Sequence, residues 1–273
     1  MQAASRESLL AARERLDEIA DELDEQALTE LSDELAAVAR LLVTEFVLRR
    51  ALSDPATDPE ARTGLADGVF ADRVAERTRQ VVAGLVHGRW STSRDLLDAF
   101  ELLTVQTIVM SAEKAGCIAD VEDELFRFAR IVGSSADLAA SLGDAIVPPA
   151  QRNRLAQDLL ADKAHPQTLR LVELAVGGFG GRIDVEAALD RLVDLVADYR
   201  QRSVAVVGVA SALTDEQQQR LSSALGRIYG REMDMHIEVD EQLLGGVRVQ
   251  VGHDLYDGSV ARRLVQARAA LRS

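Results

Sequence analysis

The chain has 273 residues, of which 47% are hydrophobic and 28% charged, and its formal net charge is −14. This length and composition are typical of a globular protein with two or three domains and exclude an intrinsically disordered chain. The acidic balance argues against a nucleic-acid partner, because it would repel a phosphate backbone.

Residues 1–201 carry a helical pattern almost throughout. Apolar residues recur at spacings of three and four, which is the period of an amphipathic helix. The first two such stripes are Leu9, Ala12, Leu16, Ile19 and Leu23, and then Leu28, Leu31, Leu35, Val38, Leu42 and Phe46. The five prolines lie where the pattern breaks, as expected of helix starts and linkers. No apolar run approaches the ~20 residues that span a bilayer, so we expect no direct membrane insertion.

The helical region contains an internal repeat with an offset of 90 residues. Residues 29–86 and 119–176 share 17 identities over 58 ungapped positions. Shared apolar positions could arise between any two helices, but matches such as Asp54 with Asp144, Pro59 with Pro149 and Arg62 with Arg152 could not. We interpret the repeat as a tandem duplication of one helical bundle.

The pattern changes after Arg202. Residues 203–211 form an apolar, β-branched run that predicts a buried strand. Thr214 and Gln217 form a capping box that opens a helix reaching Tyr229. Alternating apolar residues predict strands at 233–239 and 247–251, and Ser259 can cap a last helix over 260–271.

These elements predict a mainly α protein with a small α/β C-terminal domain of the order strand, helix, strand, strand, helix. The expected domains are an extra helical bundle over 1–97, a second helical bundle over 98–201, and the α/β domain over 202–273. From residue 202 onward the chain has nine basic and nine acidic residues, so the helical part carries the whole net charge.

No catalytic, cofactor-binding or metal-binding constellation is visible in the sequence. The four histidines lack metal-ligand spacing, and neither lysine lies in a phosphate-binding loop motif. The lone Cys117 permits no intramolecular disulfide. The run of ten acidic residues within 14–34 has two interpretations, a solvated helix face or a docking face for a basic helix. The single tryptophan, Trp90, is interpreted as a packing residue, with a binding role as the alternative.

The stretch 239–264 (VDEQLLGGVRVQVGHDLYDGSVARRL) resembles the C-terminal motif of the delta subunit of F-type ATP synthases, called the oligomycin-sensitivity-conferring protein in mitochondria. One departure is Glu241, where the family usually has proline. The stretch from about residue 96 to the C-terminus looks like one ordinary chain of that family. The first 95 residues or so are then a surplus copy of the bundle, as in long actinobacterial forms.

The resemblance implies a non-catalytic stator subunit without cofactors. In this family the helical domain binds the N-terminal helix of an alpha subunit, and the C-terminal domain binds the C-terminal end of the b subunits. The rotor then turns against a catalytic head that is held still. The residues of the C-terminal motif are expected to serve the fold: Asp240, Leu244, Gly245, Gly246, Gly252, Asp257, Gly258 and Ser259. A turn or bulge with positive φ is expected at Gly245-Gly246.

Two surfaces are expected to contact partners. The helix that begins near residue 98 has more apolar positions than one buried stripe needs, so Leu102, Val105, Ile108 and Val109 are candidates for the alpha contact. The alternative is the acidic first copy. In the last helix, Arg262 and Arg263 are candidates for contact with an acidic partner.

We therefore expect a monomer that enters the complex as a single copy, peripheral to the cell membrane on its cytoplasmic side. The rival interpretations are a free cytoplasmic helical adaptor and a ligand-sensing regulator, whose α/β domain would be the sensor.

Overall fold

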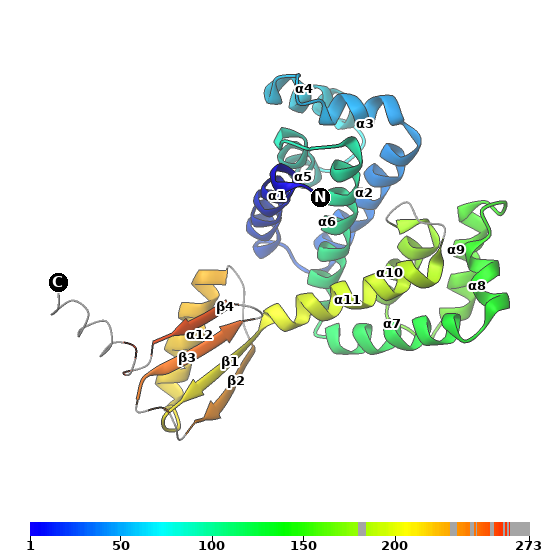
Figure 1. The fold of residues 1–273 in the computed structure, drawn as a ribbon. Helices are drawn as coiled ribbons and strands as arrows, with labels where there is room; N and C mark the ends of the chain where they lie inside the picture. Colours follow the sequence, from blue (N-terminus) through cyan, green and yellow to red (C-terminus); the bar gives the residue numbers. More distant parts are fainter. Residues whose placement is uncertain are drawn as a thin grey trace. The chain divides into compact units, whose positions relative to one another are not determined.

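A computed structural model describes residues 1–179, 184–229, 234–240, 243, 245–251, 254–258, 260 and 262. The chain divides into two compact units, Met1–Val196 and Ala197–Ser273 (Figure 1). The first unit is helical, and the second contains a small mixed sheet. The predicted fold class, mainly α with a small α/β region at the C-terminus, is confirmed.

The helical unit consists of eleven described helices joined by short connections. They are α1 (Ala3–Asp21), α2 (Glu25–Thr44), α3 (Phe46–Ser53), α4 (Pro59–Phe70), α5 (Glu76–His87), α6 (Ser93–Lys114), α7 (Ile118–Gly133), α8 (Ala136–Gly143), α9 (Pro149–Leu160), α10 (Pro166–Val176) and α11 (Val185–Ser203), the last of which continues past the unit boundary.

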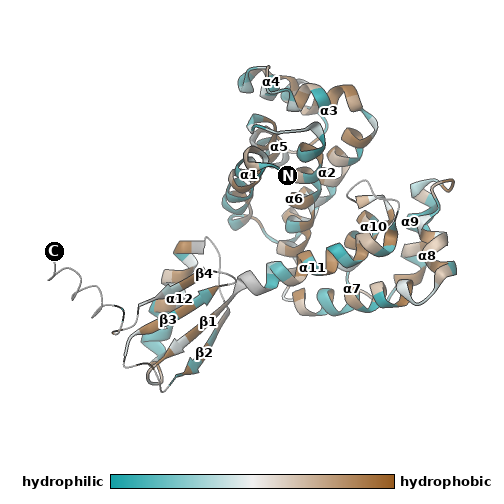
Figure 2. Ribbon diagram, viewed as in Figure 1, coloured by the Kyte–Doolittle hydropathy of each residue, from teal (hydrophilic) through white to brown (hydrophobic). Residues whose placement is uncertain are grey.

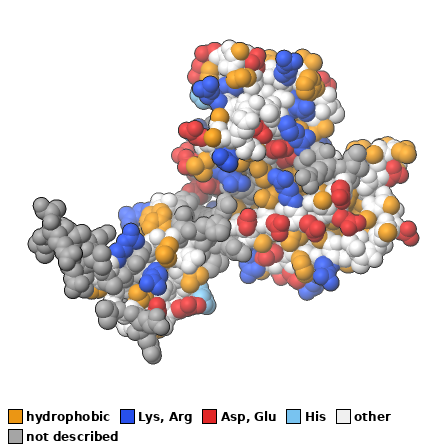
Figure 3. Space-filling view, in the orientation of Figure 1, with side chains coloured by type: hydrophobic (Ala, Val, Ile, Leu, Met, Phe, Trp, Pro, Cys, Tyr) orange, Lys and Arg blue, Asp and Glu red, His pale blue; other side chains and the backbone are white. Residues whose placement is uncertain are grey.

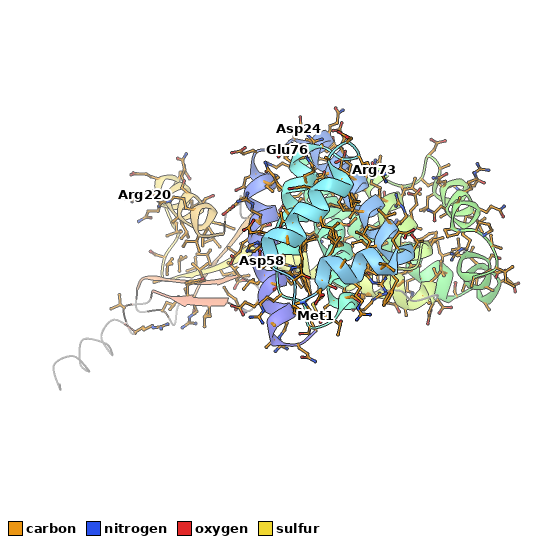
Figure 4. The ribbon with its side chains drawn as sticks, turned by 90° about the horizontal axis from the view of Figure 1, so that it is seen from above. Met1, Asp24, Asp58, Arg73, Glu76 and Arg220 are labelled. Carbon is orange, nitrogen blue, oxygen red and sulfur yellow. The ribbon has the colours of Figure 1, made fainter. Side chains whose placement is uncertain are left out.

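The helices begin where the sequence supplies caps and prolines. Asp24 and Asp58, labelled in Figure 4, precede α2 and α4, and their carboxylates accept backbone N–H groups of the first turn. Pro59, Pro149 and Pro166 each occupy the first turn of a helix, where the missing N–H has no intrahelical partner in any case.

Helix α6 is the centre of the helical unit. It is buried around most of its circumference. Figure 2 shows hydrophobic (brown) and hydrophilic (teal) residues alternating along the helices of this unit. It packs against α1, α2, α3 and α5 of the first copy and against α7 and α10 of the second. The expected boundary between residues 97 and 98 therefore falls inside one helix that both copies share, and the copies together form a single unit.

The duplication is visible in the hydrogen bonds as well as in the sequence. Glu34 on α2 accepts the backbone N–H of Ala75 at 3.0 Å and the hydroxyl of Thr78, at the start of α5. Ninety residues later, Glu124 on α7 makes the same two bonds, to the N–H of His165 at 2.9 Å and to the hydroxyl of Thr168. Each copy thus uses one glutamate to satisfy the N-terminus of a neighbouring helix.

The second unit is built on a four-stranded sheet. Its strands are β1 (Val204–Val209), β2 (Asp234–Val239), β3 (Val247–Val251) and β4 (Asp254–Asp257), in the spatial order β2-β1-β3-β4. Strands β1 and β2 are parallel, and the chain connects them through α12 (Asp215–Tyr229). Strand β3 is antiparallel to both of its neighbours, β1 and β4. The parallel pair needs a crossover connection, which the helix supplies.

One face of the sheet forms the core of the second unit. Ala205, Val207 and Val209 of β1 and Val249 and Val251 of β3 are buried together with Leu225 of α12. The capping box that begins α12 is present, since Thr214 and Gln217 exchange bonds of 2.9 and 3.3 Å. The short strand β4 was not predicted. The expected last helix over 260–271 lies almost wholly outside the described residues.

Candidate partner-binding surfaces

The apolar residues expected to meet an alpha subunit lie in the core of the helical unit. The exposed fraction is 9% for Leu102, 2% for Val105 and Ile108, and 1% for Val109. Their helix, α6, has neighbours from both copies, which accounts for its surplus of apolar positions without an open face. A partner would reach these side chains only if α6 separated from those neighbours. The contact itself stays a prediction.

Most of the acidic side chains within 14–34 bind other groups of the helical unit. Asp24 caps α2, Glu34 holds the start of α5, and Glu30 pairs with Arg77. Other members bind the second copy and α6. The guanidinium of Arg170 on α10 donates to both carboxylate oxygens of Asp33 at 2.9 and 3.1 Å, Gln167 donates to Glu25 at 3.0 Å, and Gln106 donates to Asp17 at 2.8 Å.

These bonds give much of the acidic run a structural role. Pairing with Asp33 also raises the pKa of Arg170, because the carboxylate favours the charged guanidinium. Neither the solvated-face interpretation nor the docking interpretation predicted that acidic side chains of α2 bind side chains of α10.

Two other singled-out residues are buried. Trp90 is 2% exposed, and its indole N–H donates to the carbonyl of Leu85 at 2.8 Å, which matches the packing interpretation. Cys117 is 7% exposed, and burial raises the pKa of its thiol.

The glycines of the C-terminal motif have backbone roles. Gly245 and Gly246 have φ of 144° and 87°, so the predicted positive-φ turn is confirmed. A Cβ at Gly245 would lie 3.1 Å from a methyl of Val260, and a Cβ at Gly258 would lie 3.1 Å from the carbonyl oxygen of Val247. The backbone N–H of Gly258 donates to that same carbonyl at 2.9 Å, so this bond joins the residue after β4 to the first residue of β3.

The remaining motif residues are only partly described. The backbone N–H of Asp240 donates to the carbonyl of Val209 at 2.8 Å, which ties the end of β2 to β1, and Asp257 ends β4. Of the basic pair, Arg262 is exposed. The predictions for Leu244, Gly252, Ser259 and Arg263 lie outside the described residues.

A surface that sequence reasoning missed lies between α7 and α11. A hollow of about 640 Å³ is lined by Phe126, Ala129, Arg130, Gly133, Ser134, Asp190, Val193 and Asp194. A second hollow of about 340 Å³ lies between α8 and the start of α11. Phe126 lies outside the buried stripe of α7, which is formed by Val121, Leu125, Phe128 and Val132, and it is 49% exposed.

Within the described ranges, no three or more histidine, cysteine, aspartate and glutamate side chains gather as a metal ion would require. In that same part of the chain, no helix has the length and apolar character needed to cross a membrane.

Comparison with known proteins gives one consistent family. A family model described as "ATP synthase delta (OSCP) subunit" matches residues 105–271. Proteins named "ATP synthase subunit delta" from Salinispora arenicola and Salinispora tropica are 47% and 48% identical over 272 residues, which is 99% of both chains in each case. The protein of the same name from Streptomyces avermitilis is 46% identical over 270 residues, 99% of this chain and 98% of that one. A chain from the cryo-EM structure of the Toxoplasma gondii mitochondrial ATP synthase hexamer is 17% identical, with a TM-score of 0.33, over 63% of this chain and 97% of that one.

Proposed function

Because the chain belongs to the ATP synthase delta (OSCP) subunit family, we propose that it is a stator subunit, which ties the catalytic head of an F-type ATP synthase to the membrane-anchored b subunits. The observation that carries this proposal is the similarity to delta subunits over 99% of both lengths, which includes the surplus helical copy as well as the part common to shorter chains. A stator must resist the torque of the rotor. The continuous packing of both copies around α6 suits that task, since it leaves no flexible linker between the copies.

The two units are proposed to divide the work. The helical unit binds an N-terminal helix of an alpha subunit, and residues 202–273 bind the C-terminal end of the b subunits. Support for separate roles comes from the charge, because the whole net charge of −14 resides in residues 1–201. Charge of one sign on a surface steers partners of the opposite sign and rejects others. The protein would be peripheral to the membrane, on its cytoplasmic side, as one copy per complex.

The test is add-back to inverted membrane vesicles from which the chain has been stripped at low ionic strength. We expect stripped vesicles to lose ATP-driven proton pumping, followed by quenching of a pH-sensitive dye, and to recover it when the full chain is added. ATP hydrolysis by the isolated head should not change upon addition, because a stator couples rotation without touching nucleotide.

The control is the fragment 1–202, which keeps the helical unit and lacks residues 203–273 of the proposed b-binding part. It should fail to restore pumping. Full recovery with this fragment would refute the division of work, and no recovery with the complete chain would refute the stator role.

A further inference from the structure

The two hollows beside α11 lie next to each other. Gly133 lines the larger hollow, and a Cβ built on it would lie 3.9 Å from a carboxylate oxygen of Glu186, which lines the smaller one. The wall opposite α11 is formed by α7 and then by α8, with Ala136, Ala139 and Ala140 among the lining residues. We refer to the two adjacent hollows, with α11 on one side and α7 and α8 on the other, as the groove.

The lining of the groove has a bulky apolar residue in the second copy where the first copy has alanine. At the offset of 90, Phe126 corresponds to Ala36, whereas Ala129 corresponds to the identical Ala39. The two alanines of the first copy are 8% and 6% exposed, in a helix packed closely on α6. In the second copy the bulky Phe126 stands at that position and remains 49% exposed. The second copy thus leaves open an apolar face that the first copy covers.

Three carboxylates line the α11 side of this groove. Glu186, Asp190 and Asp194 are spaced by four residues, so they lie on one face of the helix and span about 12 Å along its axis. Figure 3 shows acidic side chains in a row over α11. Arg130 is the cation that lines the opposite wall of the larger hollow.

We propose that this groove, called the α7–α11 groove, is a docking site for a cationic amphipathic helix of a protein partner. The apolar face of that helix would cover Phe126 and enter the larger hollow beside Ala129 and Val193. Lysine or arginine side chains at a spacing of four would lie beside the three carboxylates of α11. Burial of the apolar face supplies affinity, while the row of carboxylates selects a positively charged partner helix and sets its orientation in the groove. Such binding does not depend on the stator role.

The test uses two synthetic peptides and the full chain. Both peptides have 18 residues and the same leucine stripe, but one has lysines and the other has glutamates beside it. Fluorescence anisotropy should show saturable binding of the lysine peptide. Binding of the glutamate peptide should be at least about tenfold weaker, since like charges would face each other.

Variants separate this groove from general attraction to an acidic protein. Asp190→Lys should weaken the lysine peptide about threefold to tenfold. Asp67→Lys, at an exposed position on α4, changes the net charge equally and should have no effect. Ala129→Trp should block the hollow and reduce binding further, and circular dichroism checks that this variant stays folded.

Equal weakening by Asp190→Lys and Asp67→Lys would show that net charge alone attracts the peptide and would overturn the proposal. Binding unchanged by Asp190→Lys and by a folded Ala129→Trp would place the peptide elsewhere and overturn it as well.

Discussion

At the scale of single residues, buried polar groups in the helical unit serve helix ends. Arg62 is 2% exposed and donates to the carbonyls of His87 and Gly88 at 3.1 and 3.0 Å, where α5 ends. Burial lowers the pKa of its guanidinium, an effect that Asp54 and Asp58 oppose. Its repeat partner, Arg152, donates to the carbonyl of Leu142 at 3.2 Å. These bonds explain why the repeat keeps polar identities that an apolar stripe would not require.

The glutamate that holds α10 provides a stability prediction. Glu124→Ala leaves the N–H of His165 and the hydroxyl of Thr168 without this acceptor, so we expect the free energy of unfolding to fall by about 1–3 kcal/mol. The control is Asp123→Ala, which removes an exposed pair with Arg127 and should cost less than about 1 kcal/mol. Urea unfolding followed by circular dichroism measures both. Equal losses would contradict the helix-end role.

The thiol of Cys117 provides a pH prediction. Burial raises its pKa above the ordinary value, so at pH 8 the folded chain holds less thiolate than the unfolded chain. Reaction with a disulfide reagent should therefore be slow in the native protein and fast in denaturant, and the native rate should keep rising above pH 9. By linkage, the stability from this group is fully present below the unfolded pKa and is lost as pH rises through the raised folded one. A native rate equal to the denatured rate would contradict the burial.

At the scale of elements, α6 joins the two copies. It packs against α1, α2, α3 and α5 of the first copy and against α7 and α10 of the second. The copies should therefore unfold together, in contrast to two bundles on a flexible linker.

The shared helix can be tested at Ile108, which is 2% exposed. Ile108→Ala should destabilise the whole helical unit by about 2–5 kcal/mol, because the cavity lies in a core that both copies share. The fluorescence of Trp90, in the first copy, and helical circular dichroism should report one coincident transition at a lower urea concentration. Two separate transitions, with Trp90 unaffected, would contradict a common core. Leu10→Ala, at a side chain 59% exposed, serves as the control and should change little.

The sequence predicts most elements here because their signals are local. The stripes and prolines mark the helices, the capping box marks α12, and the alternating valines mark β3. What it does not predict depends on pairs distant along the chain. Helix α6 is common to both copies because helices of both copies pack against it. The α7–α11 groove has the exposed Phe126 at the position that corresponds to the buried Ala36. Strand β4 has four residues and lacks a clear alternation.

At the scale of the whole molecule, charge and fold change together near residue 200. The helical part carries the net charge of −14, and residues 202–273 are balanced. Compact units with their own cores are expected to fold separately.

Truncation tests that independence. The fragment 1–202 should keep its helical circular dichroism and cooperative unfolding, because the core of the helical unit lies within Met1–Val196. It should lose binding to the C-terminal end of the b subunits. An unfolded fragment, or one that binds b with full affinity, would contradict the account.

The central claim is that this chain works inside an F-type ATP synthase as its stator. The most direct measurement is affinity purification of the tagged full chain from a detergent extract of membranes, with the copurifying chains quantified by mass spectrometry. The account predicts alpha, beta and b chains in the eluate together with this chain. An eluate in which this chain is recovered without alpha, beta and b would contradict it.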